Sequence, residues 1–150
     1  MKRHLLYLLF CGVLLLSACK YTSPLVVQYK MTIKNNTNYD VSFVASAGGS
    51  LYAPGYNIKE IYIPSKSDWS YSWTIEEDMP LWVYVPNSVV IVIENNKYLL
   101  TKSMLIDDNP CDLSSYQIQI EADGSGKISR SFIFYEIKDC FIESLKSIEL

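Results

Sequence analysis

Residues 69–75, with the sequence WSYSWTI, carry the clearest alternation of large apolar and small polar side chains in the chain. Successive side chains of a β-strand point to opposite faces, so Trp69, Tyr71 and Trp73 share one face of this stretch. A polar turn at residues 65–68 precedes the stretch, and an acidic run with Pro80 follows it. The pattern therefore predicts a β-strand with one buried face.

The same period of two recurs on both sides of this stretch. Residues 27–33 and 116–120 alternate in a similar way, and residues 128–137 predict a returning strand. Residues 89–93 are β-branched and apolar on both faces, which is typical of a central strand. Clusters rich in asparagine or glycine separate the stretches and predict turns at residues 35–38, 94–97 and 123–126. This spacing predicts an all-β fold, an antiparallel and Ig-like β-sandwich of about seven to nine strands.

Two local elements are predicted besides the main pattern. Residues 27–33 and 39–46 are separated by a turn, so they predict a first hairpin. The apolar residues of the tail are instead spaced near the helical period, which predicts a short helix at residues 139–147, with a strand as the rival interpretation. Asp139 is placed to cap the start of this helix.

The first nineteen residues form a segment of a different kind. Lys2 and Arg3 give a positive start, residues 5–16 are almost unbroken apolar sequence, and the segment closes with Leu16-Ser17-Ala18-Cys19. This layout predicts a secretory signal peptide. The closing four residues resemble the lipobox of bacterial lipoproteins, which implies removal of residues 1–18 and acylation of Cys19. The alternative, a retained transmembrane helix, needs about twenty apolar residues, and this run is shorter.

The predicted domain organisation follows from this leader. Residues 1–18 are the signal peptide, residues 19–25 are a lipidated tether, and residues 26–150 are the β-sandwich domain. The lipid makes a membrane the expected partner, because each buried methylene of an acyl chain contributes about 0.8 kcal/mol. Lys20 stands where many inner-membrane lipoproteins have aspartate, which favours the outer membrane and leaves the periplasmic or surface side open.

The composition of the chain after Ala18 excludes several classes of function. Of the thirteen Lys and Arg residues, eleven remain once Lys2 and Arg3 are removed with the signal peptide. All sixteen Asp and Glu residues remain, so the formal net charge is −5. One arginine, Arg130, remains, whereas nucleic-acid binding needs clustered Lys and Arg. The only histidine, His4, lies in the signal peptide, which removes Ser-His-Asp and Cys-His catalysis and imidazole zinc sites.

Carboxylate chemistry is not removed by this argument. Residues 76–78 and 107–109 are acidic clusters that could bind calcium or place two carboxylates for glycoside hydrolysis. Neither cluster matches a calcium-loop pattern, and acidic residues are common in turns. We therefore interpret both as solvated turns, and we expect no catalytic residue, no metal and no cofactor.

Two cysteines remain in the predicted domain. Cys111 and Cys140 form an even pair in an exported chain, which favours a disulfide. Such a bond would stabilise the fold by a few kcal/mol on the chain-entropy model. The alternative is two separate buried thiols, since the spacing of the two residues in space cannot be read from the sequence.

The aromatic residues supply the candidate ligand-binding residues. If the face that carries Trp69, Tyr71 and Trp73 points outward, it is a flat platform suited to sugar rings or to a protein partner. If it points toward a second sheet, the same residues are core, and this is the favoured interpretation because large aromatics usually supply core burial. Tyr62 and Tyr84, which have apolar neighbours, are then the better candidates for an exposed surface.

Three further stretches, together with the lipobox, carry a wider resemblance. The chain combines Asn35-Asn36-Thr37, Ile61-Tyr62-Ile63-Pro64 and a final strand at residues 131–135 with the lipobox. This order looks like that of small β-sandwich lipoproteins of anaerobic gut bacteria, a group with no catalytic motif to carry over. We expect a membrane-anchored, non-catalytic module that binds or assembles with an envelope protein; the alternative is a glycan-binding surface module.

Overall fold

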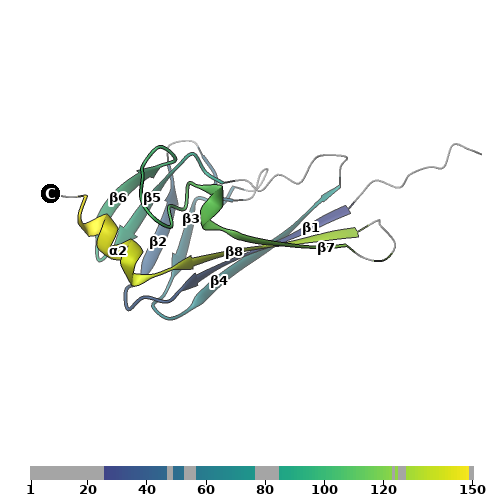
Figure 1. Ribbon diagram of the computed structural model, residues 1–150, viewed down its shortest axis with the longest axis horizontal. Coiled ribbons are helices and arrows are strands. Elements are labelled where there is room, and N and C mark those ends of the chain that lie inside the picture. Colours follow the sequence, from purple (N-terminus) through teal and green to yellow (C-terminus); the bar gives the residue numbers. More distant parts are fainter. Residues whose placement is uncertain are drawn as a thin grey trace, which may run out of the picture.

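The computed structural model describes residues 26–46, 49–52, 57–76, 85–122, 124 and 128–148. These residues form two four-stranded sheets, a short 3₁₀ helix and one α-helix (Figure 1). Sheet A contains, in spatial order, β4 (Asp68–Glu76), β1 (Val26–Asn35), β8 (Ile128–Ile137) and β7 (Gln117–Ala122). Sheet B contains β3 (Glu60–Ile63), β2 (Val41–Ala45), β5 (Ser88–Ile93) and β6 (Asn96–Thr101). The predicted all-β sandwich is confirmed.

The pairing of β1 separates this sandwich from a simple meander. β1 pairs with β4 in the antiparallel sense and with β8 in the parallel sense, and the other pairs are antiparallel. A parallel pair cannot be joined by a tight turn, but β1 and β8 lie near opposite ends of the chain and need no short connection. β1 and β2 belong to different sheets, so the predicted first hairpin is wrong.

A buried asparagine explains why the chain leaves sheet A after β1. The side-chain amide of Asn35 donates to the carbonyls of Tyr39, Ile63 and Pro64, at 2.7, 3.1 and 3.0 Å. Its carbonyl oxygen accepts from the backbone N–H and the hydroxyl of Thr37. These bonds turn the chain toward sheet B and tie this corner to the end of β3.

The core lies between the two sheets. β1 places Val27, Tyr29, Met31 and Ile33 on its inner face, and all four side chains are buried. α2 (Asp139–Lys146) closes one end of the sandwich with Phe141, Ile142 and Leu145. The predicted C-terminal helix is thus confirmed, although Lys138 is the N-cap residue and Asp139 lies in the first turn.

The two sheets differ in length. β1 and β8 have 10 residues each and β4 has 9, whereas the strands of sheet B have 4 to 6. At about 3.3 Å per residue, sheet A is longer than sheet B by a third or more. Figure 1 shows the strands of sheet A continuing beyond sheet B, away from α2. We call this part, where β1 and β8 begin and β7 ends, the projecting end.

The connection from β6 to β7 is held by buried side chains. The amide of Asn109 donates to the carbonyls of Thr101 and Met104, both at 3.0 Å, and its oxygen accepts from the N–H of Cys111. Tyr135 of β8 donates its hydroxyl to the carbonyl of Asp108 at 2.7 Å. The chain then passes through the 3₁₀ helix η1 (Leu113–Ser115) from sheet B into sheet A.

Candidate functional site

The outer face of sheet A, turned away from sheet B, carries a long groove that follows β8. Its middle part has a volume of about 680 Å³ and lies over Phe132 and Phe134. A second part of about 490 Å³ lies toward the projecting end, over Phe132 and Arg130, and crosses β1 to Ser72 and Thr74 of β4. A third, smaller part of about 170 Å³ continues from Phe134 toward α2, past Glu136. We call the three parts together the outer groove.

Strand register sets the composition of the middle part. Phe132 lies beside Lys30 of β1 on one side and Gln119 of β7 on the other. Phe134 lies in the same way between Thr32 and Gln117. Each half-buried phenyl ring is therefore flanked by two polar side chains on neighbouring strands. This arrangement offers apolar ring surface and hydrogen-bonding groups side by side.

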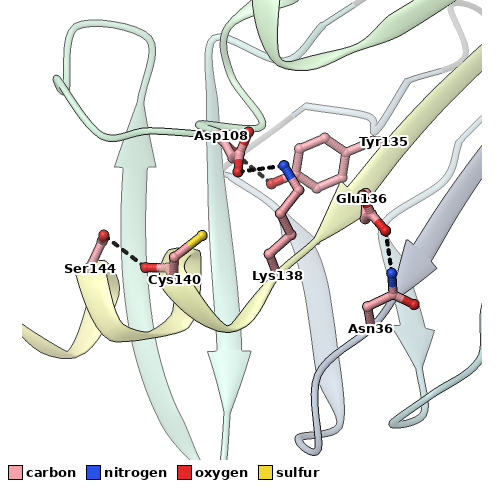
Figure 2. Close-up of polar contacts among 7 residues, drawn as sticks. All are labelled: Asn36, Asp108, Tyr135, Glu136, Lys138, Cys140 and Ser144. Carbon is pink, nitrogen blue, oxygen red and sulfur yellow. Dashed lines mark hydrogen bonds and ion pairs between the residues drawn. The ribbon is translucent and has the colours of Figure 1, made fainter.

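Both ends of the outer groove carry charged side chains that already have partners. Near the projecting end, the Nε of Arg130 donates to Gln28 at 3.3 Å. Near α2, the ammonium of Lys138 pairs with the Asp108 carboxylate at 3.2 Å, and the hydrogen bond to this carboxylate is the main reason why the pKa of Lys138 is raised. Figure 2 shows this pair and the hydrogen bond from Asn36 to Glu136 on the neighbouring strand.

The chemistry of this lining suits recognition. Amide and hydroxyl groups donate and accept hydrogen bonds, and phenyl rings provide faces for stacking. The carboxylate of Glu121 accepts from the amide of Gln119 at 2.9 Å, so this acid too is engaged by a neighbour. In the part of the chain that the structure describes, no cluster of three or more His, Cys, Asp or Glu could hold a metal ion.

The predicted aromatic platform lies on the other face of sheet A. Trp69, Tyr71 and Trp73 oppose Ile33, Met31 and Tyr29 of β1, so they belong to the inner face. Trp73 is buried and stacks on Tyr29 with ring centroids 5.2 Å apart, while Trp69 and Tyr71 are half-buried and pack against the core. This agrees with the interpretation of these residues as core.

The remaining aromatic candidates have separate outcomes. Tyr62 is 56% exposed on the outer face of sheet B, and its hydroxyl donates to Asp40 at 2.6 Å. It lies on β3 and does not join the outer groove, which is formed by sheet A. Tyr84 lies outside the described residues, as does Cys19, the predicted lipidation site.

The predicted disulfide between Cys111 and Cys140 is not formed. Both are free thiols, Cys111 buried and Cys140 exposed in the first turn of α2. The thiol of Cys111 points into the fold and lies 3.7 Å from the carbonyl oxygen of Leu100 on β6. Burial raises the pKa of this thiol to about 11. The even cysteine count therefore misled the sequence interpretation.

The residues of the outer groove were not singled out from the sequence. Residues 128–137 carry apolar side chains at both even and odd positions. The pattern therefore does not show whether Phe132 and Phe134 or Ile133 and Tyr135 face outward. A useful signal was present in β7, where Gln117, Gln119 and Glu121 alternate with isoleucines and mark the polar face.

Comparisons with protein-family models, curated proteins and solved structures find no match to this chain. Within the described ranges, no helix is long and apolar enough to cross a membrane.

Proposed function

We propose that the protein is a lipid-anchored, non-catalytic binding module of the bacterial cell envelope, with its ligand seated in the outer groove. The anchoring rests on Leu16-Ser17-Ala18-Cys19, which closes a signal-peptide-like leader. The binding role rests on one observation, the open groove along β8 in which two phenyl rings lie among amide and hydroxyl groups.

The form of the outer groove favours binding over chemistry. Catalysis generally needs a nucleophile or an acid-base pair held in a water-excluded site. The outer groove is open, and three of its charged groups, Arg130, Glu121 and Lys138, already contact neighbouring side chains. Lys30, beside Phe132, adds a further positive charge to the lining. These features fit a surface that holds a ligand without changing it.

A glycan is the second candidate for the ligand, beside an envelope protein. Sugar rings stack their C–H faces on aromatic rings, and their hydroxyls bond to side-chain amides. The alternation of Phe132 and Phe134 with Gln117 and Gln119 provides both groups on adjacent strands. This replaces the platform of Trp69, Tyr71 and Trp73, which lies on the inner face, as the site for such a ligand.

Anchoring is tested by mass spectrometry of the full-length chain expressed in a bacterial host. The expected N-terminal residue is Cys19 carrying acyl chains, and the protein partitions into the detergent phase. A Cys19→Ser variant should lose the lipid mass and leave that phase. Retention of Met1 in the wild-type protein, or an unmodified Cys19 thiol, contradicts the anchoring.

Ligand binding is tested by screening the full-length protein in detergent against envelope glycans and envelope proteins. A ligand of the outer groove should bind the Phe132→Ala and Phe134→Ala variants at least tenfold more weakly, a loss of about 1.4 kcal/mol. Leu99→Ala, which removes an exposed side chain of sheet B, is the matched control and should bind normally. A ligand whose affinity is unchanged in both Phe variants places its site elsewhere and contradicts the proposal.

A further inference from the structure

Among the described residues, no strand pairs with the edge of β7 that faces away from β8, and the side chains of β7 are unusual for such an edge. All six of its residues are exposed, and Ile118 and Ile120 are 40% and 53% exposed on the inner face of sheet A. An edge strand presents unpaired N–H and C=O groups, and proteins usually protect such edges with Lys, Pro or a bulge. β7 contains neither Lys nor Pro, and it pairs with β8 in continuous register.

Of the other three edge strands, β6 and β3 are better protected, whereas β4 pairs with β1 alone among the described residues. On β6, the carbonyls of Leu100 and Thr101 accept hydrogen bonds from Cys111 and Asn109, so the following loop lies against this strand. β3 has only 4 residues, and it contacts β4 at the side where the two sheets meet. Among the described residues, β7 makes its strand pairing with β8 alone.

The sequence of β7 is nearly symmetric about Gln119. When two copies of β7 are placed antiparallel with Gln119 opposite Gln119, Ile118 of each copy lies opposite Ile120 of the other. Gln117 then lies opposite Glu121, so an amide donor faces a carboxylate acceptor at both ends. Opposed residues in an antiparallel pair share a face, so this register joins four isoleucines on the inner side and places no like charges opposite one another.

We infer that β7 is a self-association surface, through which two copies of this chain pair edge to edge. The two four-stranded A sheets then form one continuous eight-stranded sheet. The two-fold axis is perpendicular to the sheet and passes midway between the two Gln119 residues, so the contact is isologous and each copy uses the same residues. The contact is smaller than the roughly 1,600 Å² of a standard interface, so pairing is reversible and depends on concentration.

Disulfide trapping tests the register of this pair in the full-length chain in detergent. Opposed Cα atoms of an antiparallel pair lie about 4.5–5.5 Å apart, within the range that a disulfide spans. In a Cys140→Ser background, Gln119→Cys should form covalent dimers under mild oxidation. Gln117→Cys should form several-fold fewer, because its partner is residue 121, but an equimolar mixture with Glu121→Cys should restore them. If Gln117→Cys without its partner variant forms as many covalent dimers as Gln119→Cys does, the register and the inference are overturned.

Sedimentation across a concentration series tests the association itself. The wild-type mass should rise from one chain toward two, and Gln119→Lys should weaken pairing about fivefold because two like charges become directly opposed. Thr74→Lys, on the same face at the other edge of sheet A, is the matched control and should pair as the wild type does. Mixing Gln119→Lys with Gln119→Glu should restore pairing. A single-chain mass throughout, or a Gln119→Lys protein that pairs like the wild type, overturns the inference.

Discussion

The hydroxyl of Thr37 donates to the side-chain oxygen of Asn35 at 2.7 Å, and neither residue exposes any surface. The asparagine also bonds three carbonyls on two other segments, so one polar side chain joins the end of β1, the start of β2 and the end of β3. A buried polar group of this kind stabilises the fold only while every partner is present.

Removal of the Asn35 side chain should therefore be costly. We expect Asn35→Ala to lower the free energy of unfolding by about 3 kcal/mol, because buried carbonyls lose their donor. Asn35→Asp keeps the size but removes the N–H donors, and should be as damaging at neutral pH. Urea denaturation measures both changes. The control is Asn38→Ala at an exposed position, which should lower the free energy of unfolding by less than about 0.5 kcal/mol. A change as small as that of the control contradicts this role.

Tyr62 and Asp40 should give a stability contribution that depends on pH. Hydrogen bonds from the Tyr62 hydroxyl and then from the Ser65 N–H lower the pKa of Asp40 below 3.8. A carboxyl group with a lowered folded-state pKa stabilises the fold above its unfolded pKa and loses this effect as the pH falls through the folded value. Tyr62→Phe should therefore be less stable than the wild type at pH 7, and the difference should shrink below about pH 4. Urea midpoints from pH 7 to pH 2.5 measure this, and a pH-independent difference contradicts the assignment.

The two thiols of the domain should differ in reactivity. Cys140 is exposed, whereas burial of Cys111 raises its pKa to about 11 and keeps it protonated at pH 8. A thiol reagent at pH 8 should give a fast phase that is lost in Cys140→Ser and kept in Cys111→Ser, because the thiolate is the reactive form. Labelling of Cys111 should require denaturant. If the fast phase is absent and the protein is two hydrogens lighter before reduction than after it, Cys111 and Cys140 form a disulfide, and this prediction is contradicted.

Three buried tyrosines should resist alkaline titration. Burial raises the pKa of Tyr52, Tyr116 and Tyr135 above 10, and their rings pack against one another. A raised folded-state pKa gives stability that is present below pH 10 and lost as the pH rises above it. Absorbance at high pH should show exposed tyrosines ionising first and these three ionising only with unfolding. Ionisation of all tyrosines near pH 10 without loss of the fold contradicts this.

The sequence was informative where one face of a strand is polar. The alternation around Trp73 predicted β4 and its buried face, and Glu94 and Asn95 predicted the turn between β5 and β6, where both residues have positive φ. Such local features depend on side-chain period and turn chemistry, which are visible in a single chain.

Other features depend on which strands become neighbours. Asn35 resembles any turn asparagine in the sequence, yet its bonds to Ile63 and Pro64 send β2 to the opposite sheet. The face of Phe132 is decided by its pairing with Lys30, about one hundred residues away in the chain. Long-range pairing of this kind leaves no local pattern, so the outer groove could not be located before the fold was known.

The projecting end of sheet A has a consequence for the proposed anchoring, because it is the end from which the proposed tether would lead. Val26 begins β1 there, directly after the proposed tether, so a single copy held by the proposed lipid would stand on this end, with α2 at the far end of the domain. Antiparallel pairing through β7 points the two projecting ends in opposite directions. Two lipids at opposite poles would hold such a pair flat along one membrane, so association would tip each domain from standing to lying.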